Sequence, residues 1–247
     1  MPRTVCAETL DGLAADDPAA MRSRRDLRRV HRVMGTRSIV LRAWRDMMAS
    51  RPPTTPLRVL ELGAGDGRLM LGVAGALGPD GPAVELTLLD RQPLVERATI
   101  EAYAALGWTA AARVGDVLDW AAAATDPLPK AAGAARWDLI VAILFLHHFE
   151  AASLGVLLGA IAARCDRFFA CEPRRAWLAL AGSRLIGAIG ANAVTRGDAV
   201  LSVRAGFRGS ELAALWPVRG GGWQTDEYSA GLFSHCLRAE RVGTHRA

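Results

Sequence analysis

The sequence has almost no lysine, few cysteines and no long apolar run. Four of its 247 residues are cysteine, and none of them shows the CxxC spacing of a zinc site. We therefore expect buried free thiols and no metal centre. The longest uninterrupted apolar run, Leu139 to Leu146, is far too short to span a membrane. No apolar stretch follows the first arginine, so we expect no signal peptide and a cytoplasmic protein.

The positive charge is carried by arginine. Lys130 is the only lysine, the net charge is +5, and nine arginines face the single acid Asp26 between Met21 and Arg45. Such a basic helical pair can bind nucleic acid, an anionic lipid or an acidic substrate. A solvated helix face is the simpler interpretation, and we favour it.

The N-terminal part predicts a helical cap. Residues 1–20 lack periodicity and are expected to be frayed. A helix is predicted over 21–34, where Gly35 ends it, and a second helix begins at Ser38. A proline linker at 51–53 closes this extension.

After the linker, short apolar strands alternate with helices. Strands are predicted over residues 57–62, 83–89, 110–114, 137–146 and 167–171, and helices over 67–77, 93–106 and 151–163. The fourth strand is nearly all apolar, as a central parallel strand buried on both faces should be. This alternation predicts a doubly wound, Rossmann-like α/β fold.

The last third of the chain differs. A helix is predicted over 174–191, an irregular stretch over 192–207 and a short helix over 210–216. Two strands, 223–229 and 232–237, should then pair antiparallel.

A glycine loop carries the first chemical signal. Glu61, Gly63, Gly65 and Gly67 follow the first strand with ExGxGxG spacing, which differs from the GxGxxG of dinucleotide folds. Glycine allows positive φ and close approach of a ligand. Asp66 would repel a phosphate, so the loop favours a cationic ligand over a pyrophosphate.

Acids end the next two strands. Asp90 can accept both hydroxyls of a ribose, or cap a helix before Pro93. Asp116 can accept the amine of adenine beside the apolar Val117, or act as a helix N-cap.

Two histidines follow the fourth strand. His147 and His148 stand at the carboxyl end of a central strand, over the crevice where open α/β sheets bind ligands. Either can take a proton near neutral pH, or one can cap the next helix while the other packs against it.

The ordered motifs from Glu61 to Phe149 resemble the class I S-adenosylmethionine-dependent methyltransferases. The Leu-His-His-Phe segment ending at Phe149 resembles the small-molecule subgroup that includes quinone-biosynthesis C-methyltransferases. The resemblance covers about residues 57–172 and implies a seven-stranded sheet with a reversed last strand. Where that subgroup often has asparagine, this chain has Ile143.

The resemblance also implies roles for individual residues. Glu61, Gly63 and Gly65 would lie along the methionine part of the cofactor, Asp90 at the ribose, and Asp116 and Val117 at the adenine. The cofactor-binding set is completed by Ala64, Arg91 and Leu144. His147 and His148 are the catalytic candidates.

The segment after the fifth strand is the expected substrate lid. The resemblance implies a cap over 1–52, a methyltransferase domain over 53–247 and a lid insertion over 174–216, although 192–207 could also be a plain surface loop. Glu172 and Arg174 could face the substrate or pair with each other, and we favour the salt bridge.

The predicted function is methyl transfer from S-adenosylmethionine to oxygen or carbon of a small phenolic, quinol or lipid-like acceptor. No Asn/Asp-Pro-Pro-Tyr segment follows the fourth strand, which disfavours amine targets. The alternatives are an RNA or protein methyltransferase that uses the basic helices, and a non-catalytic cofactor-binding module. A NAD-dependent oxidoreductase is disfavoured by the loop spacing.

Overall fold

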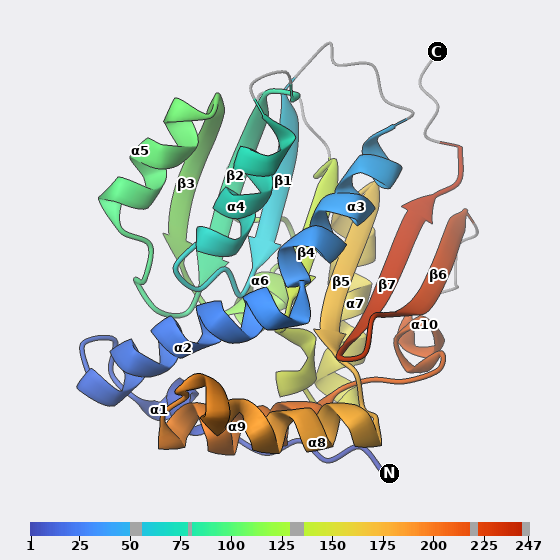
Figure 1. Ribbon diagram of the computed structural model, residues 1–247. Helices are drawn as coiled ribbons and strands as arrows, with labels where there is room; N and C mark the ends of the chain where they lie inside the picture. Colours follow the sequence, from blue (N-terminus) through green and yellow to red (C-terminus); the bar gives the residue numbers. More distant parts are fainter. Residues whose placement is uncertain (50–55, 79–80, 129–135, 218–221, 244–247) are drawn as a thin grey trace.

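The computed structural model describes residues 1–49, 56–78, 81–128, 136–217 and 222–243. They form one seven-stranded sheet in the order β3-β2-β1-β4-β5-β7-β6 (Figure 1). The strands are β1 (Leu57–Leu62), β2 (Val84–Asp90), β3 (Trp108–Val114), β4 (Leu139–Ile143), β5 (Arg167–Pro173), β6 (Trp223–Ala230) and β7 (Ser234–Arg241).

The sheet confirms the predicted fold class. Strands β1 to β5 are parallel, and β7 lies antiparallel between β5 and β6. Every residue of β4 is buried, as its apolar sequence predicts. Because the chain reverses order at β1 and β4, the crevice beyond their carboxyl ends is the place where such sheets bind ligands.

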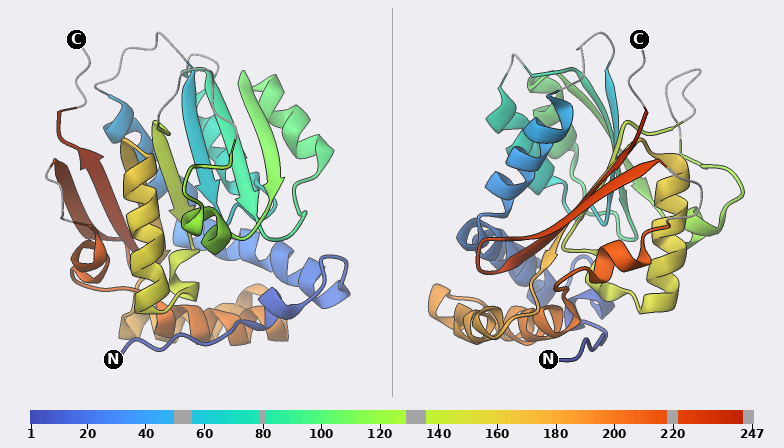
Figure 2. Two further views of the ribbon diagram at one scale, coloured as in Figure 1. Left: turned by 180° about the vertical axis from the view of Figure 1, so that it is seen from behind. Right: turned by 90° about the vertical axis from the view of Figure 1, so that its right-hand side faces the viewer.

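Helices cover both faces of the sheet. One face carries α3 (Thr36–Met48), α4 (Arg68–Leu77) and α5 (Arg97–Ala105), and the other carries α6 (Val117–Ala122), α7 (Ala151–Arg164) and α10 (Glu211–Leu215) (Figures 1 and 2). Each layer has its own apolar core, one containing Trp44 and Trp108, the other Trp137 and Phe168. This burial is the main stabilising term of the domain.

A third group of helices lies across the carboxyl ends of the parallel strands (Figure 1). It contains α1 (Thr9–Gly12), α2 (Pro18–Met34), α8 (Trp177–Leu185), the short 3-10 helix η2 (Ile186–Ile189) and α9 (Ala193–Ala205). Polar contacts hold α2 on α9: Ser23 Oγ lies 2.7 Å from Thr195 Oγ1, and Asp26 accepts a hydrogen bond from the Asn192 amide at 2.7 Å. The ligand crevice is therefore covered by helices that are not part of the two central cores.

The prediction that residues 1–20 are frayed is wrong. Residues 1–13, called the N-terminal strap below, are tied down by hydrogen bonds to distant parts of the chain. Thr4 donates to the Arg204 carbonyl at 3.1 Å, and Asp198 accepts from the Thr9 and Leu10 amides at 2.8 and 2.9 Å. The strap has no internal periodicity because its order comes from partners far away in the sequence.

The irregular stretch predicted over 192–207 is also wrong, because α9 occupies most of it. Asn192 caps the helix by accepting from the Thr195 amide at 2.8 Å. Thr195 and Asp198 are buried polar residues of this helix. Their side chains bind neighbouring helices and the strap, which hides the apolar stripe that identifies a helix from sequence.

Two predicted boundaries near the site shift. The helix expected from Pro93 begins at Arg97, and the fourth strand ends at Ile143 instead of Leu146. Residues 146–148 form the short 3-10 helix η1 (Leu146–His148). The proline linker lies outside the described residues, and among those described no helix is long and apolar enough to cross a membrane.

Candidate active site

One cavity of about 1150 Å³ lies between the carboxyl ends of the parallel strands and the roofing helices. All of the predicted site residues line it, although they come from four separate loops: Glu61, Gly63, Ala64, Gly65, Asp90, Arg91, Asp116, Val117, Leu144, His147 and His148. The sheet topology brings these loops together, since the strands that precede them end at the same edge.

The glycine loop opens toward the cavity. Gly63, Gly65 and Gly67 all have positive φ. Asp90 fixes the loop by accepting from the Gly65 amide at 2.8 Å. A Cβ on Gly65 would meet no other atom within 4 Å, so the space above it is open. The backbone can thus approach a ligand closely at this point.

Glu61 supplies an unpartnered carboxyl oxygen beside this loop. Its side chain is buried, and its Oε2 atom has no hydrogen-bond partner among the residues that the structure describes. Burial raises its pKa well above the ordinary value, and the charges of Asp66 and Asp90 raise it further. An ammonium group bound here would satisfy the orphaned oxygen.

Asp66 does not supply the charge for a cationic ligand in the way its sequence position suggested. It pairs with Arg28 at 3.1 Å and with Arg68 at 3.6 Å. These two arginines offset its charge. Glu61 has no such arginine partner among the described residues and also lines the cavity.

The two strand-end acids have partners already. Asp90 accepts from the Gln92 amide at 2.9 Å as well as from Gly65, and it caps no helix because α5 begins at Arg97. Asp116 caps α6 by accepting from the Leu118 amide at 2.7 Å. Each carboxylate also lines the cavity. A structural role at both positions is thus compatible with ligand binding.

The chain turns sharply between β4 and the histidines. Leu144 has φ of 52°, the only positive φ outside glycine in the described part of the chain. Beyond it, the amides of Phe145 and Leu146 donate to Oε1 of Glu172 at 3.0 and 2.9 Å. The strained backbone is held by these contacts, as is common at functional sites.

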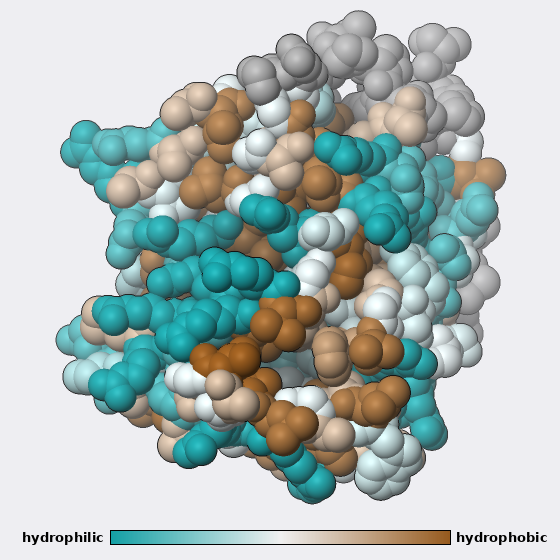
Figure 3. Space-filling view, in the orientation of Figure 1, coloured by the Kyte–Doolittle hydropathy of each residue, from teal (hydrophilic) through white to brown (hydrophobic). Residues whose placement is uncertain are grey.

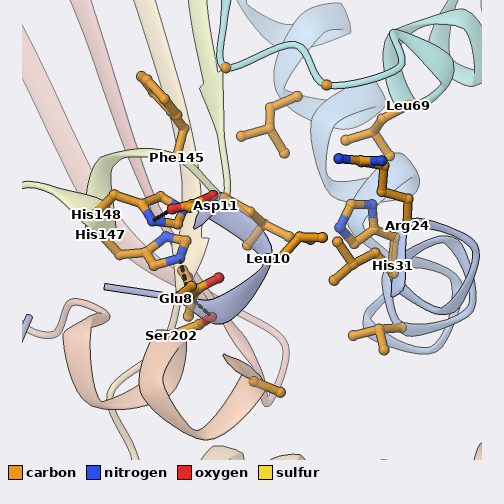
Figure 4. Close-up of a pocket in the computed structure, with 18 of the residues that line it drawn as sticks. Glu8, Leu10, Asp11, Arg24, His31, Leu69, Phe145, His147, His148 and Ser202 are labelled. Carbon is orange, nitrogen blue, oxygen red and sulfur yellow. Dashed lines mark hydrogen bonds and ion pairs between the residues drawn. The ribbon is translucent and has the colours of Figure 1, made fainter. Parts of the chain in front are cut away.

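His147 lies between the carboxylates of Glu172 and Glu8, of which Figure 4 labels Glu8. Its Nδ1 is 2.8 Å from Glu172 Oε2, and its Nε2 is 3.4 Å from Glu8 Oε1. Burial by itself would lower the pKa of His147, but the hydrogen bonds and charges of Glu172 and Glu8 outweigh burial and raise that pKa from 6.5 to about 9. The ring is therefore cationic at neutral pH while Glu8 is in place.

The His148 ring lies beside that of His147, with ring centroids 4.2 Å apart and the planes inclined by 33°. Its Nδ1 is 3.1 Å from Asp11 Oδ2. In the described part of the chain, Glu8, His147 and His148 form the one group with metal-binding potential, with ligand atoms within 4.8 Å of one another. The ion pairs account for this grouping without a metal.

The N-terminal strap contributes site residues that the sequence did not indicate. Glu8 and Asp11 both point at the histidine pair (Figure 4). Ser202 of α9 donates to Glu8, and Arg91 donates to the Asp11 carbonyl at 3.2 Å. No local motif marks these acids, and only the path of the strap across the cavity brings them there.

The predicted salt bridge between Glu172 and Arg174 does not form. Glu172 is fully buried and binds the η1 backbone and His147. Arg174 donates to the Gly231 carbonyl at 3.4 Å. Residues two apart within a strand point to the same face. However, β5 ends at Pro173, so Arg174 lies beyond the strand and its side chain turns away from Glu172.

The wall opposite the histidines mixes apolar and basic groups. Arg24, His31 and Leu69 face the histidine pair across the cavity (Figure 4). Burial lowers the pKa of His31 from 6.5 to about 4, so this ring is neutral. The remaining lining between α2 and α8 is largely apolar and includes Leu27, Val30, Met34 and Ile186.

The sheet order, the reversed β7 and the glycine loop after β1 are those of the class I methyltransferase fold. Among solved structures, the plantazolicin methyltransferase BamL in complex with a triazolic desmethylPZN analog and SAH matches with 14% identity and a TM-score of 0.61, over 94% of this chain and 93% of that one.

Two further structures share the fold. The plantazolicin methyltransferase BpumL with the triazolic analog and SAH is 13% identical, with a TM-score of 0.62, over 91% of this chain and 92% of that one. Magnesium protoporphyrin IX methyltransferase (ChlM) from Synechocystis PCC 6803 with bound SAH is 19% identical, with a TM-score of 0.52, over 88% and 86%. Protein-family models and curated proteins give no match. At these low identities, the structural likeness shows the fold alone.

Proposed function

We propose that this chain is an S-adenosylmethionine-dependent methyltransferase that methylates oxygen or carbon of a small phenolic, quinol or lipid-like acceptor. The observation that carries the proposal is the continuity of one cavity from the glycine loop to the His147–Glu172 pair. The solved structures named above contain SAH in the same fold, which supports the choice of cofactor.

The residues at the carboxyl ends of β1, β2 and β3 fit this cofactor. Glu61 would hold the ammonium group with its unpartnered Oε2, and Asp90 would accept from the ribose hydroxyls. Asp116 and Val117 would flank the adenine, with Gly63, Ala64, Gly65, Arg91 and Leu144 completing the wall. Bound there, S-adenosylmethionine supplies an activated methyl group on a sulfonium, so no metal is required.

The cavity has room for an acceptor beside the cofactor. Its volume of about 1150 Å³ exceeds the range of roughly 300–1,000 Å³ typical of a pocket for one ligand. The lining between α2 and α8 is largely apolar. An acceptor with an apolar body and one polar, ionisable atom fits this combination.

The His147–Glu172 pair is the proposed base. Glu172 holds Nδ1 and fixes the ring, which leaves Nε2 facing the cavity toward Glu8. Cationic His147 cannot accept a proton. We propose that the acceptor hydroxyl replaces the Glu8 carboxylate at Nε2, which lowers the pKa of His147, so that the imidazolium releases its Nε2 proton to water. The neutral ring then takes the hydroxyl proton.

The roofing elements are the proposed lid. Residues 1–52 would act as a cap, and 174–216 as the insertion that closes over the acceptor. In support, buried polar contacts such as Ser23–Thr195 join α2 to α9, and a polar interface separates more readily than an apolar core. The strap bridges both parts through Glu8 and Ser202.

Turnover on a panel of phenols, quinols and hydroxylated lipids with radiolabelled S-adenosylmethionine tests the proposal. The expected result is label in an organic product, lost in His147→Ala. Cofactor binding without turnover on any acceptor would support a cofactor-binding module instead. Label in RNA or protein would support the alternative that uses the basic helices.

A further inference from the structure

Helix α8 exposes an apolar face to solvent. Trp177, Leu178 and Leu185 are 74%, 66% and 69% exposed, respectively. They share the outward side of the helix with Ala181 and Arg184, at spacings of one, four, seven and eight residues. Large apolar side chains so exposed in one stripe mark an interaction surface.

The inward face of the same helix is already occupied. Ala179, Leu180 and Ser183 are buried, and Gly182 and Ser183 also line the cavity. The inward side of α8 therefore packs on the rest of the protein. The outward apolar stripe has no partner in this chain among the described residues, so packing within the chain does not account for its apolar side chains.

Two more large apolar side chains close to α8 are exposed. Ile189, at the end of η2, is 38% exposed and also lines the cavity, and Leu232, in the turn between β6 and β7, is 56% exposed. That turn lies against α8, because a Cβ on Gly182 would be 2.8 Å from the Phe233 ring. Brown, apolar side chains gather on the lower part of the face in Figure 3, where α8 lies.

The charge around this surface is positive. Residues 174–208 contain six arginines and one acid, Asp198. Asp198 is buried against the strap and its charge is held by the Thr9 and Leu10 amides. The exposed arginines of the segment are Arg184, Arg196, Arg204 and Arg208, the last of which lies 3.9 Å from Glu211. Such a surface attracts an anionic partner.

Helix α2 adds arginines on the same side. Arg22, Arg25, Arg29 and Arg32 are exposed, and hydrophilic side chains cover the part of Figure 3 where α2 lies. Arg29 reaches η2, where it donates to the Ile189 carbonyl at 3.0 Å. The basic helix and the apolar stripe thus meet at the rim of the cavity.

We propose that the outward face of α8, with the arginines around it, binds an anionic lipid bilayer surface. An apolar helix face with tryptophan and arginine is the composition of interfacial helices. Arginines near the surface add attraction to anionic headgroups. A second copy of this chain would place one arginine-rich face opposite another, which disfavours self-association.

A lipid surface at α8 would also narrow the class of acceptor, a step that rests on the proposed function. The cavity lies between α2 and α8, so a bilayer held against α8 lies beside its apolar lining. A lipophilic acceptor can then pass from the bilayer to the His147 side without crossing water. The acceptor class that fits this arrangement is a phenol or quinol dissolved in the membrane.

Vesicle sedimentation with the full chain tests the proposal without any turnover. The chain should pellet with phosphatidylcholine–phosphatidylglycerol vesicles and remain in solution with phosphatidylcholine alone. The double variant Leu178→Glu, Leu185→Glu should weaken binding by more than about tenfold, because two apolar side chains no longer enter the interface. Val156→Glu, which changes a residue 61% exposed on α7, should bind like the wild type.

The other outcomes contradict the proposal. Equal losses of vesicle binding in the α8 variant and in Val156→Glu would show that the α8 face has no specific role in that binding. No binding to anionic vesicles would reject the lipid surface, and a dimer that the α8 variant converts to a monomer would assign the stripe to a second copy of this chain. Vesicle binding with no methyl transfer would keep the lipid surface and reject the proposed function, so the two failures are distinguishable.

Discussion

Nδ1 of His147 lies 2.8 Å from Oε2 of Glu172, in a site where both residues are buried. The same carboxylate accepts from the amides of Phe145 and Leu146, so the ring and the η1 backbone share one anchor. An imidazole oriented in this way resembles the base of many proton-transfer enzymes. The contribution of His147 and of its carboxylate neighbours to turnover can therefore be measured with single substitutions.

Replacing His147 should remove the proton acceptor and leave the cofactor bound. In His147→Ala we expect kcat to fall about 10²-fold or more, with an unchanged dissociation constant for S-adenosylhomocysteine. Steady-state kinetics and calorimetry measure the two quantities. His148→Ala is the matched control, since its Nδ1 contacts the strap residue Asp11 and we expect a smaller loss. Equal turnover in wild type and His147→Ala would place the base elsewhere.

Glu8 should set the pH dependence of turnover. With the pKa of His147 at about 9, kcat/KM of the wild type should rise with pH up to that value, because it reports the free enzyme. Glu8→Gln removes one negative neighbour, so the rising limb should move to lower pH. Asp16→Asn, an exposed acid just beyond the strap, should leave the profile unchanged. An unmoved limb in Glu8→Gln would contradict the ion pair.

The same pKa predicts a stability change with pH. The folded-state pKa of His147 is raised from 6.5 to about 9. The group therefore contributes its full stabilisation below about pH 6.5 and loses it as the pH rises through about 9. Urea unfolding should show a fall in the free energy of unfolding across this window. The fall should be smaller in Glu8→Gln, and an equal fall in both proteins would count against the assignment.

A chelator should leave methyl transfer unchanged. The Glu8–His147–His148 group can bind a metal ion, but the proposed chemistry uses the ion pairs instead. We expect full activity after EDTA treatment and inhibition by added Zn²⁺, which would compete for the histidine nitrogens. Loss of activity with EDTA and recovery with a divalent ion would contradict the proposed mechanism and indicate a metal-dependent reaction.

The sequence contained the sheet, the cofactor loops and the roofing helices α2 and α8, but not the strap or α9. Local features determined the strands and the turns after them: apolar runs such as 139–143 and glycines such as Gly65 with positive φ. All of the predicted site residues line the cavity for this reason. These signals are short-range and survive in a single sequence.

The strap and α9 were not predicted because their contacts are long-range and polar. Glu8 meets His147, and Asp198 meets Thr9, across most of the chain length. No periodicity records such pairs, so residues 1–20 and 192–207 were predicted to lack structure. The exposed stripe of α8 was equally hidden, since a predicted helix over 174–191 does not show which side faces the core.

The most direct test of the account is a calorimetric titration of the chain with S-adenosylmethionine. We expect one site per chain, weakened by roughly tenfold or more in Asp90→Ala because a carboxylate in a ribose contact and its loop anchor are both lost. Asp226→Ala, an exposed change on β6, should bind like the wild type. Absence of binding to the wild type, or equal affinity in Asp90→Ala, would contradict the central claim.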